Sequence, residues 1–289
     1  MRCKVALLFV GIPRKFRKNL HMLTLSEIWI YPVKSLGGIS LTEAHAEPRG
    51  LRYDRRWMLT DENGRFFTQR EIPEMALLGT AIDDSALHIF WKNRPTEKIR
   101  VPLEYEAGEL PETEVQVWDD TCLARVLPAH INNWLSAALK QKVQLVYMPD
   151  STRRQTDLAY TSEGEHVSFA DGYPYLIIGQ ASLDALNERL DTPLPMNRFR
   201  PNFVFTGGTP HEEDAWTDFS IGTTRFRGVK PCARCSITTT DQDTATRAAE
   251  PLKTLATYRN TGKKILFGQN VILTGGDGVV RRGTKLSYE

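Results

Sequence analysis

The sequence contains few cysteines and no long apolar segment. Four cysteines in 289 residues are too few for a disulfide framework, which favours a reducing, cytoplasmic compartment. No run of about 20 apolar residues is present, so we expect no membrane-spanning segment. The formal net charge is only +2, from 37 Lys and Arg against 35 Asp and Glu, and this balance gives no electrostatic basis for binding nucleic acid.

Several common signatures of active sites are also missing. The sequence has no G-x-G-x-x-G dinucleotide motif, no Walker loop, no H-E-x-x-H zinc motif and no G-x-S-x-G elbow. The six histidines are scattered without ligand spacing, so we interpret them as surface or packed side chains. Two acidic clusters, at residues 212–214 and 241–243, are interpreted as exposed turns and not as acid/base pairs.

Strand patterns dominate the sequence and predict a β-rich α+β fold. The expected strands include residues 28–31, 203–205 and 271–273. The expected hairpins join residues 57–60 to 65–68 through Asn63-Gly64, and residues 115–118 to 123–126. Helical spacing of apolar residues occurs in three short stretches, at residues 131–139, 183–190 and 251–258.

The length predicts about two domains. A polar stretch at residues 149–165 is the expected boundary between them. Residues 1–22 have basic flanks around a short apolar run, and we expect them to form an extension outside the fold. This extension is either an untranslated stretch upstream of Met22 or a basic arm at a membrane surface.

The most informative segment contains Cys232 and Cys235. A C-x-x-C pair in a reducing compartment indicates structural zinc or thiol redox chemistry. Zinc needs about four ligands, and the other two cysteines are isolated in the sequence. The β-branched residues after Cys235 predict a strand, whereas a thioredoxin-like pair requires a helix. These points leave a thiol at a strand edge beside Arg234, which would favour the thiolate, or two ordinary part-buried cysteines.

Five motifs occur in order along the chain: YPVKS at 31–35, GLRYDRRW at 50–57, FRPN at 199–202, KPCARC at 230–235 and FGQN at 267–270. Together they resemble the MOSC-domain family preceded by its N-terminal β-barrel domain. Within that family the pattern is similar to bacterial N-hydroxylated-base reductases and the mitochondrial amidoxime-reducing component. The resemblance implies a β-barrel-like domain at residues 23–148 and a MOSC β-barrel domain with a few short helices at residues 149–289.

The resemblance further implies that the chain binds a molybdenum–molybdopterin cofactor. Lys34, Arg55 and Arg200 are the cations that the family motifs place around the pterin phosphate, and the planar fork of arginine matches phosphate oxygens. By the same match Cys235 is the catalytic residue and the metal ligand, with Cys232 as the alternative. The other implied cofactor-binding residues are Ser35, Asp171, Gly172, Asn202, Ala233, Arg234 and Asn270. On a strand, Arg200 and Asn202 would point to the same face.

The activity that the resemblance implies is reduction of N-hydroxylated compounds, namely hydroxylamines, amidoximes and N-hydroxylated nucleobases, to amines or amidines. Several bacterial relatives continue into an iron–sulfur module, but no Cys-rich loop follows Thr284 here. We therefore expect no iron–sulfur cluster in this chain and a separate electron donor, which would be a flavoprotein reductase, a ferredoxin or a cytochrome. The alternative is a molybdenum cofactor carrier or a sulfur-handling protein without reductase turnover, because MOSC domains also occur in cofactor sulfurases.

Overall fold

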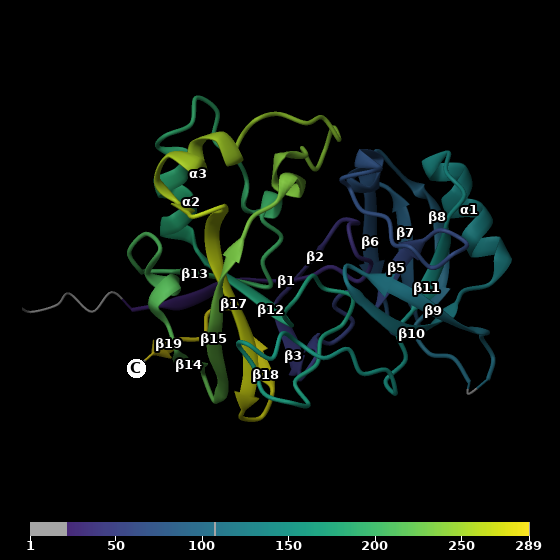
Figure 1. Cartoon of the computed structure of the whole chain (residues 1–289), viewed down its shortest axis with the longest axis horizontal. Helices are drawn as coiled ribbons and strands as arrows, with labels where there is room; N and C mark the ends of the chain where they lie inside the picture. The colour runs from purple at the N-terminus through teal and green to yellow at the C-terminus, as the bar shows by residue number, and fades with distance from the viewer. Residues whose placement is uncertain (1–21, 107, 289) are drawn as a thin grey trace, which may run out of the picture.

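The computed structural model describes residues 22–106 and 108–288, so the expected extension lies outside it except for Met22. The chain forms two lobes that lie side by side (Figure 1). The first, called the α1 lobe, contains α1 (Ala129–Leu139) and two small sheets. The second, called the large-sheet lobe, contains a nine-stranded sheet with α2 (Gln180–Asn187) and α3 (Leu252–Tyr258). The expected β-rich α+β fold with a few short helices is confirmed.

The nine-stranded sheet curls around an apolar core. In spatial order its strands are β19 (Leu286–Tyr288), β14 (Asp218–Ile221), β15 (Thr224–Ala233), β17 (Lys264–Gly275), β12 (Tyr175–Gly179), β13 (Phe203–Thr206), β1 (Thr24–Ile30) and β2 (Ile39–Leu41), with β16 (Asn260–Thr261) paired to β17. Tyr175, Phe203 and Phe226 meet on its inner face, with ring centroids 5.3–5.6 Å apart. Helices α2 and α3 pack their apolar residues on the other face, against Ile178 and Phe267.

The α1 lobe is built from two sheets and one amphipathic helix. One sheet contains β5 (Trp57–Thr60), β11 (Gln144–Tyr147), β10 (Asp120–Val126) and β9 (Glu112–Val117), and the other contains β6 (Leu78–Ile82), β7 (Ala86–Trp91) and β8 (Arg94–Pro102). Helix α1 buries Ile131, Leu135 and Leu139, which are spaced four residues apart, in the same core as Trp57. The helix ends where Lys140 adopts a left-handed backbone (φ 52°).

The N-terminal strands belong to the large-sheet lobe. Strand β1 pairs antiparallel with β13, so that Leu25 lies opposite Phe205. Strand β3 (Glu43–Glu47) pairs with β18 (Val279–Arg281) and with β4 (Gly50–Leu51). The segments that follow β1 and β4 cross to the α1 lobe, where Lys34 N donates to Trp57 O. The domain boundary after residue 148 stays a prediction.

One of the two expected hairpins needs correction. The hairpin expected to join residues 115–118 to 123–126 forms as the β9–β10 pair. The return arm expected at residues 65–68 makes only isolated bridges, and β5 pairs with β11 instead. The arm bends away because Thr68 N and Thr68 Oγ1 both donate to Glu71 Oε2 (3.0 and 2.8 Å). Such local side-chain bonds compete with strand pairing.

The prediction of a strand after Cys235 is also wrong. A 3₁₀ helix, η4 (Ser236–Thr239), begins there. The hydroxyls of Thr238 and Thr239 donate back to the carbonyls of Cys235 and Ser236 (2.9 and 2.7 Å), which stabilises the turn against the β propensity of threonine. The other 3₁₀ helices are η1 (Pro73–Leu77), η2 (Met196–Arg198) and η3 (Glu212–Ala215). No helix in residues 22–106 and 108–288 is long and apolar enough to cross a bilayer.

The acidic cluster at residues 212–214 is not an exposed turn, because Glu213 is fully buried between β12 and α2. Its carboxylate accepts hydrogen bonds from Gly179 N (3.1 Å) and Ser182 Oγ (2.8 Å). Burial raises the pKa of Glu213 to about 7. Burial also lowers the pKa of the nearby His211 to about 4.

These pKa values predict a pH-dependent stability. The folded protein binds the Glu213 proton more tightly than the unfolded chain, whose pKa is about 4.5. The stability from Glu213 is therefore complete below pH 4.5 and is lost as the pH rises through 7. In Glu213→Gln this loss should disappear, so that the difference in unfolding free energy between the two proteins changes by about 3 kcal/mol between pH 4.5 and 7.5.

Urea unfolding of both proteins at the two pH values measures this difference. His211 has the opposite effect on stability, which rises as the pH increases from about 4 to 6.5. Because both proteins contain His211, its contribution cancels in the comparison. A difference that does not change with pH would contradict the assignment.

Candidate cofactor site

A pocket lies where the two lobes meet, and it gathers side chains from distant parts of the chain. The lining residues that the sequence pointed to are Lys34, Ser35, Arg55, Asp171, Gly172, Arg200, Asn202, Cys232, Arg234, Cys235 and Asn270. Ala233 is not among the lining residues, because it lies exposed at the end of β15. The pocket is also lined by apolar and aromatic residues that the sequence analysis did not assign to the site, namely Tyr173, Tyr175, Leu176, Phe199 and Ile237.

Three of the polar lining residues have a left-handed backbone. The φ angles are 69° at Ser35, 50° at Arg55 and 54° at Arg200. Residues other than glycine adopt this conformation at a cost, and such residues concentrate at functional sites. Arg200 and Asn202 both line the pocket, as expected, but they lie in an irregular segment before β13, so the strand expected at these two residues is wrong.

Lys34 is buried and already has partners in the protein. Its Nζ donates to Phe169 O (2.7 Å) and to Asp171 Oδ1 (2.6 Å). Burial lowers the pKa of Lys34 from its ordinary value, and Asp171 opposes that shift. The ammonium thus fixes the loop at residues 169–171 against the segment that follows β1.

Arg55 bridges the segments around the pocket. Its Nη1 pairs with Asp54 Oδ2 (2.7 Å), a carboxylate whose side chain is fully buried. The same guanidinium donates to Asn202 Oδ1 (3.3 Å) and to Arg200 O (3.1 Å). Asp54 Oδ1 accepts from Tyr31 N (2.7 Å). Most of the hydrogen-bonding capacity of Arg55 is therefore used within the protein.

Arg200 differs from the other two cations. It is 9 % exposed, its Nη2 is buried without a hydrogen-bond partner, and burial lowers its pKa to about 10. Its guanidinium lies 4.2 Å from the centre of the Tyr31 ring, and that of Arg55 lies 4.4 Å from the same centre. A buried donor without a partner is costly, and a bound anion would satisfy it. The residues present therefore fit a phosphate-bearing group.

The two cysteines have different surroundings. Arg234 Nη1 donates to Cys232 Sγ (3.0 Å), and Cys232 packs against the apolar residues under α2 and α3. Cys235 is the last residue before η4. Within residues 22–106 and 108–288, no three His, Cys, Asp or Glu side chains converge on a metal position. The donor set fits a soft metal that arrives with other ligands and takes one thiolate from the protein.

A buried amide pair fixes the segment after Cys235 against the α1 lobe. Gln69 Nε2 donates to Gln242 Oε1 (3.1 Å), and Gln242 Nε2 donates to Gln69 Oε1 (3.0 Å). Gln69 Nε2 also donates to Ser35 O (2.7 Å). This network holds both walls of the pocket in register. The acidic turn that contains Gln242 has a structural role, since Asp241 Oδ2 pairs with Arg198 (2.9 Å).

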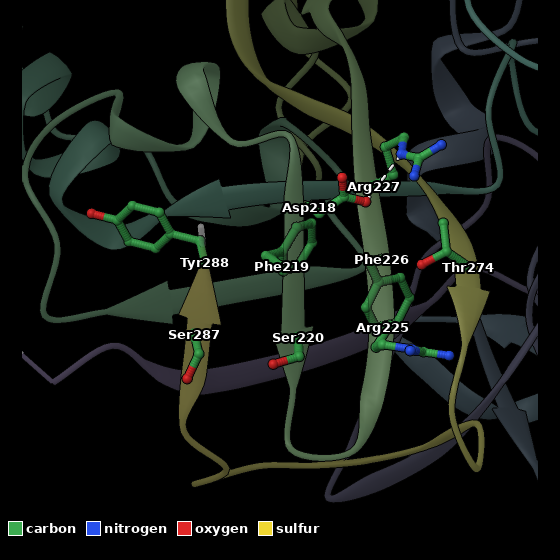
Figure 2. A pocket seen from close by; sticks show the side chains of 9 residues that line it. All are labelled: Asp218, Phe219, Ser220, Arg225, Phe226, Arg227, Thr274, Ser287 and Tyr288. Carbon is green, nitrogen blue, oxygen red and sulfur yellow. Dashed lines mark hydrogen bonds and ion pairs between the residues drawn. The ribbon is translucent and has the colours of Figure 1, made fainter.

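A second, larger hollow lies over β14, β15, β17 and β19 (Figure 2). Figure 2 shows the ion pair between Asp218 and Arg227 (3.0 Å) across its upper part. Ser220 and Ser287 line the same hollow. It contains neither cysteine and none of the motif residues, so size alone does not identify the functional pocket here.

Two family models match the chain, the MOSC N-terminal beta barrel domain over residues 22–142 and the MOSC domain over residues 164–287. The chain is also 32 % identical to mitochondrial amidoxime-reducing component 1 of Mus musculus, over 94 % of this chain and 84 % of that protein. The chain belongs to the MOSC-domain family. The resemblance inferred from the five motifs is thereby confirmed.

Two further relatives of this MOSC protein differ in how much of their own length is matched. Mitochondrial amidoxime reducing component 2 of Rattus norvegicus is 32 % identical over 86 % of this chain and 75 % of that protein. Molybdenum cofactor sulfurase of Oryza sativa subsp. japonica is 32 % identical over 89 % of this chain, but the match spans only 33 % of the sulfurase. The MOSC protein thus corresponds to about a third of that longer relative.

The geometry of the MOSC pocket predicts opposite effects for its two arginines in the cofactor-free protein. Arg55→Met leaves the buried Asp54 carboxylate without its cation and should lower the unfolding free energy by about 3–5 kcal/mol. Arg200→Met removes a buried charge with an unsatisfied donor, so stability should stay within about 1 kcal/mol or rise. Chemical denaturation of protein made without the cofactor measures both effects.

The exposed neighbour Arg52 provides the control variant Arg52→Met, which should leave stability unchanged. Equal losses for Arg55→Met and Arg200→Met would show that Arg200 has structural partners of the same value as those of Arg55.

Proposed function

We propose that the protein is a molybdenum-cofactor-dependent reductase that converts N-hydroxylated compounds to amines or amidines. The observation that carries the proposal is the buried Arg200 guanidinium, whose unpartnered Nη2 lies in a residue that lines the same pocket as Cys232 and Cys235. The Arg200 guanidinium can donate to a phosphate oxygen, and a cysteine thiolate can bind a soft metal. The pocket therefore suits a cofactor that has a phosphate at one end and a soft metal at the other. The similarity to an amidoxime-reducing component over 84 % of its length supports the same class of substrate.

The proposed roles follow the lining of the pocket. Lys34, Ser35, Arg55 and Arg200 would hold the phosphate, with Arg200 supplying the free donor. The proposed pterin contacts come from the lining residues Asp171, Gly172, Asn202, Arg234 and Asn270, and from Ala233, which lies outside the lining between Cys232 and Arg234. The proposed metal ligand is Cys235, with Cys232 as the alternative. Cys235 is preferred because Cys232 already accepts a hydrogen bond from Arg234 and packs against apolar residues.

When bound, such a cofactor supplies two electrons for cleavage of the substrate N–O bond, and with two protons the oxygen leaves as water. The residues of the chain bind and orient the reactants at the pocket. The sequence contains four cysteines and no iron–sulfur motif, so the proposal includes a separate electron-donor protein. A flavoprotein reductase, a ferredoxin and a cytochrome are the candidate classes of donor.

A second candidate function is cofactor carriage or sulfur transfer without reductase turnover. The match of 89 % of the chain to part of a molybdenum cofactor sulfurase favours it. A sulfur-handling protein would carry a persulfide on Cys232 or Cys235 and would bind the cofactor without reducing N-hydroxylated compounds.

Substitution of the cysteines tests the assignment of the ligand. Protein from a host that makes the cofactor should contain molybdenum and pterin in near-equal amounts. Cys235→Ser should abolish reduction of hydroxylaminopurine with a chemically reduced viologen as donor, while most of the pterin stays bound, because a hydroxyl is a poor ligand for a soft metal. Cys232→Ser should retain activity. Metal analysis, pterin fluorescence and amine formation measure the three quantities.

The control is Cys122→Ala, because Cys122 is buried in the core of the α1 lobe and does not line the pocket, so this variant should match the wild type. A reversed order of the two pocket variants would move the ligand to Cys232. A persulfide without turnover would support the sulfur-handling function, and stoichiometric zinc without molybdenum would overturn both.

A further inference from the structure

An exposed tryptophan lies beside the pocket in a strained conformation. Trp118 follows β9 and lies in the tight turn that connects it to β10. Its φ angle is 58°, in the left-handed region that glycine, asparagine and aspartate occupy most easily. Its side chain is nevertheless large and remains 36 % exposed. Strained backbone conformations concentrate at functional sites, so this conformation of a bulky, exposed residue indicates a binding role.

The indole of Trp118 is fixed to the rim of the pocket. Its Nε1 donates to Asp171 Oδ1 (3.2 Å), the atom that also accepts from Lys34 Nζ (2.6 Å). The guanidinium of Arg70 lies 4.1 Å from the centre of the indole ring, and the Phe66 ring meets the indole edge-on at 5.2 Å. The orientation of the ring is therefore set before any ligand arrives, so binding would cost little side-chain entropy.

Contacts around the rim connect this pair to the segment that carries Cys235. Arg70 follows Gln69, which pairs with Gln242 in the segment after η4. Arg247 from the same segment donates to Arg70 O (2.7 Å). Trp118 and Arg70 are not themselves lining residues, but Trp118 contacts the lining residue Asp171, and the backbone of Arg70 contacts the segment after Cys235. Both side chains keep part of their surface open to solvent.

We infer that Arg70 and Trp118 form a stacking platform that selects planar aromatic N-hydroxylated substrates, such as N-hydroxylated purines and pyrimidines. The inference rests on the proposed reductase function and deepens it. An indole and a guanidinium plane both offer π surface to a heterocyclic base. An aliphatic hydroxylamine has no such surface and gains nothing from the pair. Trp118 and Arg70 are therefore specificity-determining residues beside the pocket, and the N–O bond is reduced within the pocket itself.

The test compares two substrates in Trp118→Gly, a substitution that also relieves the left-handed strain. With 6-hydroxylaminopurine the KM should rise about tenfold or more, because stacking on the indole is lost, while kcat stays within about twofold. With N-methylhydroxylamine both constants should stay at the wild-type values. Trp118→Phe keeps a π face and should restore most of the affinity for the purine. Arg70→Met should weaken purine binding in the same direction.

A binding measurement without turnover provides a second readout. The fluorescence of 2-aminopurine is quenched on stacking, so titration with the purified holoenzyme should give a Kd about tenfold weaker for Trp118→Gly than for the wild type. The control is Tyr160→Ala, which removes another exposed aromatic residue, stacked on Lys230, and should leave the Kd unchanged. Thermal melting checks that the variants fold.

The possible results separate the platform from the reductase function. An unchanged KM for the purine in Trp118→Gly, or an equal loss of kcat with both substrates, would overturn the platform and leave the reductase function intact. Trp118-dependent binding of 2-aminopurine in a protein that reduces neither substrate would support the platform and overturn the reductase function.

Discussion

The buried Asp54 carboxylate organises the junction on which the pocket depends. It accepts from the amide of Tyr31 and neutralises Arg55, which then donates across the junction to the carbonyl of Arg200 and to Asn202. One anion without solvent contact therefore links three loops that are distant in sequence. A buried carboxylate has a large desolvation cost unless its partners are in place, so the loops can adopt this arrangement only together.

The three cations of the pocket have different partners in the folded protein. Lys34 and Arg55 face carboxylates of the protein, and they hold the walls in position. Arg200 stacks on Tyr31 and keeps a donor without a partner. An incoming anion thus meets a site whose geometry is already fixed and displaces few existing bonds at Arg200. Such preorganisation lowers the entropic cost of binding the anion, because the side chains are already ordered in the folded protein.

The sequence predicts the composition of the site better than its local geometry. The motifs predict the lining residues, because they resemble those of a family with a known site and they meet in one pocket here. The three helices are predicted by the spacing of apolar residues such as Ile131 and Leu135. The turn after Cys235 was not predictable from propensity, because hydroxyl-to-backbone bonds from Thr238 and Thr239 outweigh it. The left-handed backbone at non-glycine residues also has no signal in the sequence, since tertiary contacts impose it.

The position of β1 has a consequence for synthesis of the chain. The hydroxyl of Thr206 lies against the carbonyl of Thr24, a separation of 182 residues, so the first described strand leaves the ribosome long before its partner β13 exists. The α1 lobe, by contrast, draws β5 to β11 from consecutive sequence and can form while synthesis continues. Until β13 emerges, the backbone edge of β1 that pairs with it has no partner, and the apolar side chains of Leu25 and Ile28 lack the core in which they are buried in the folded protein. The pocket is therefore among the last parts of the molecule to assemble, because its lining includes residues up to Asn270 in β17.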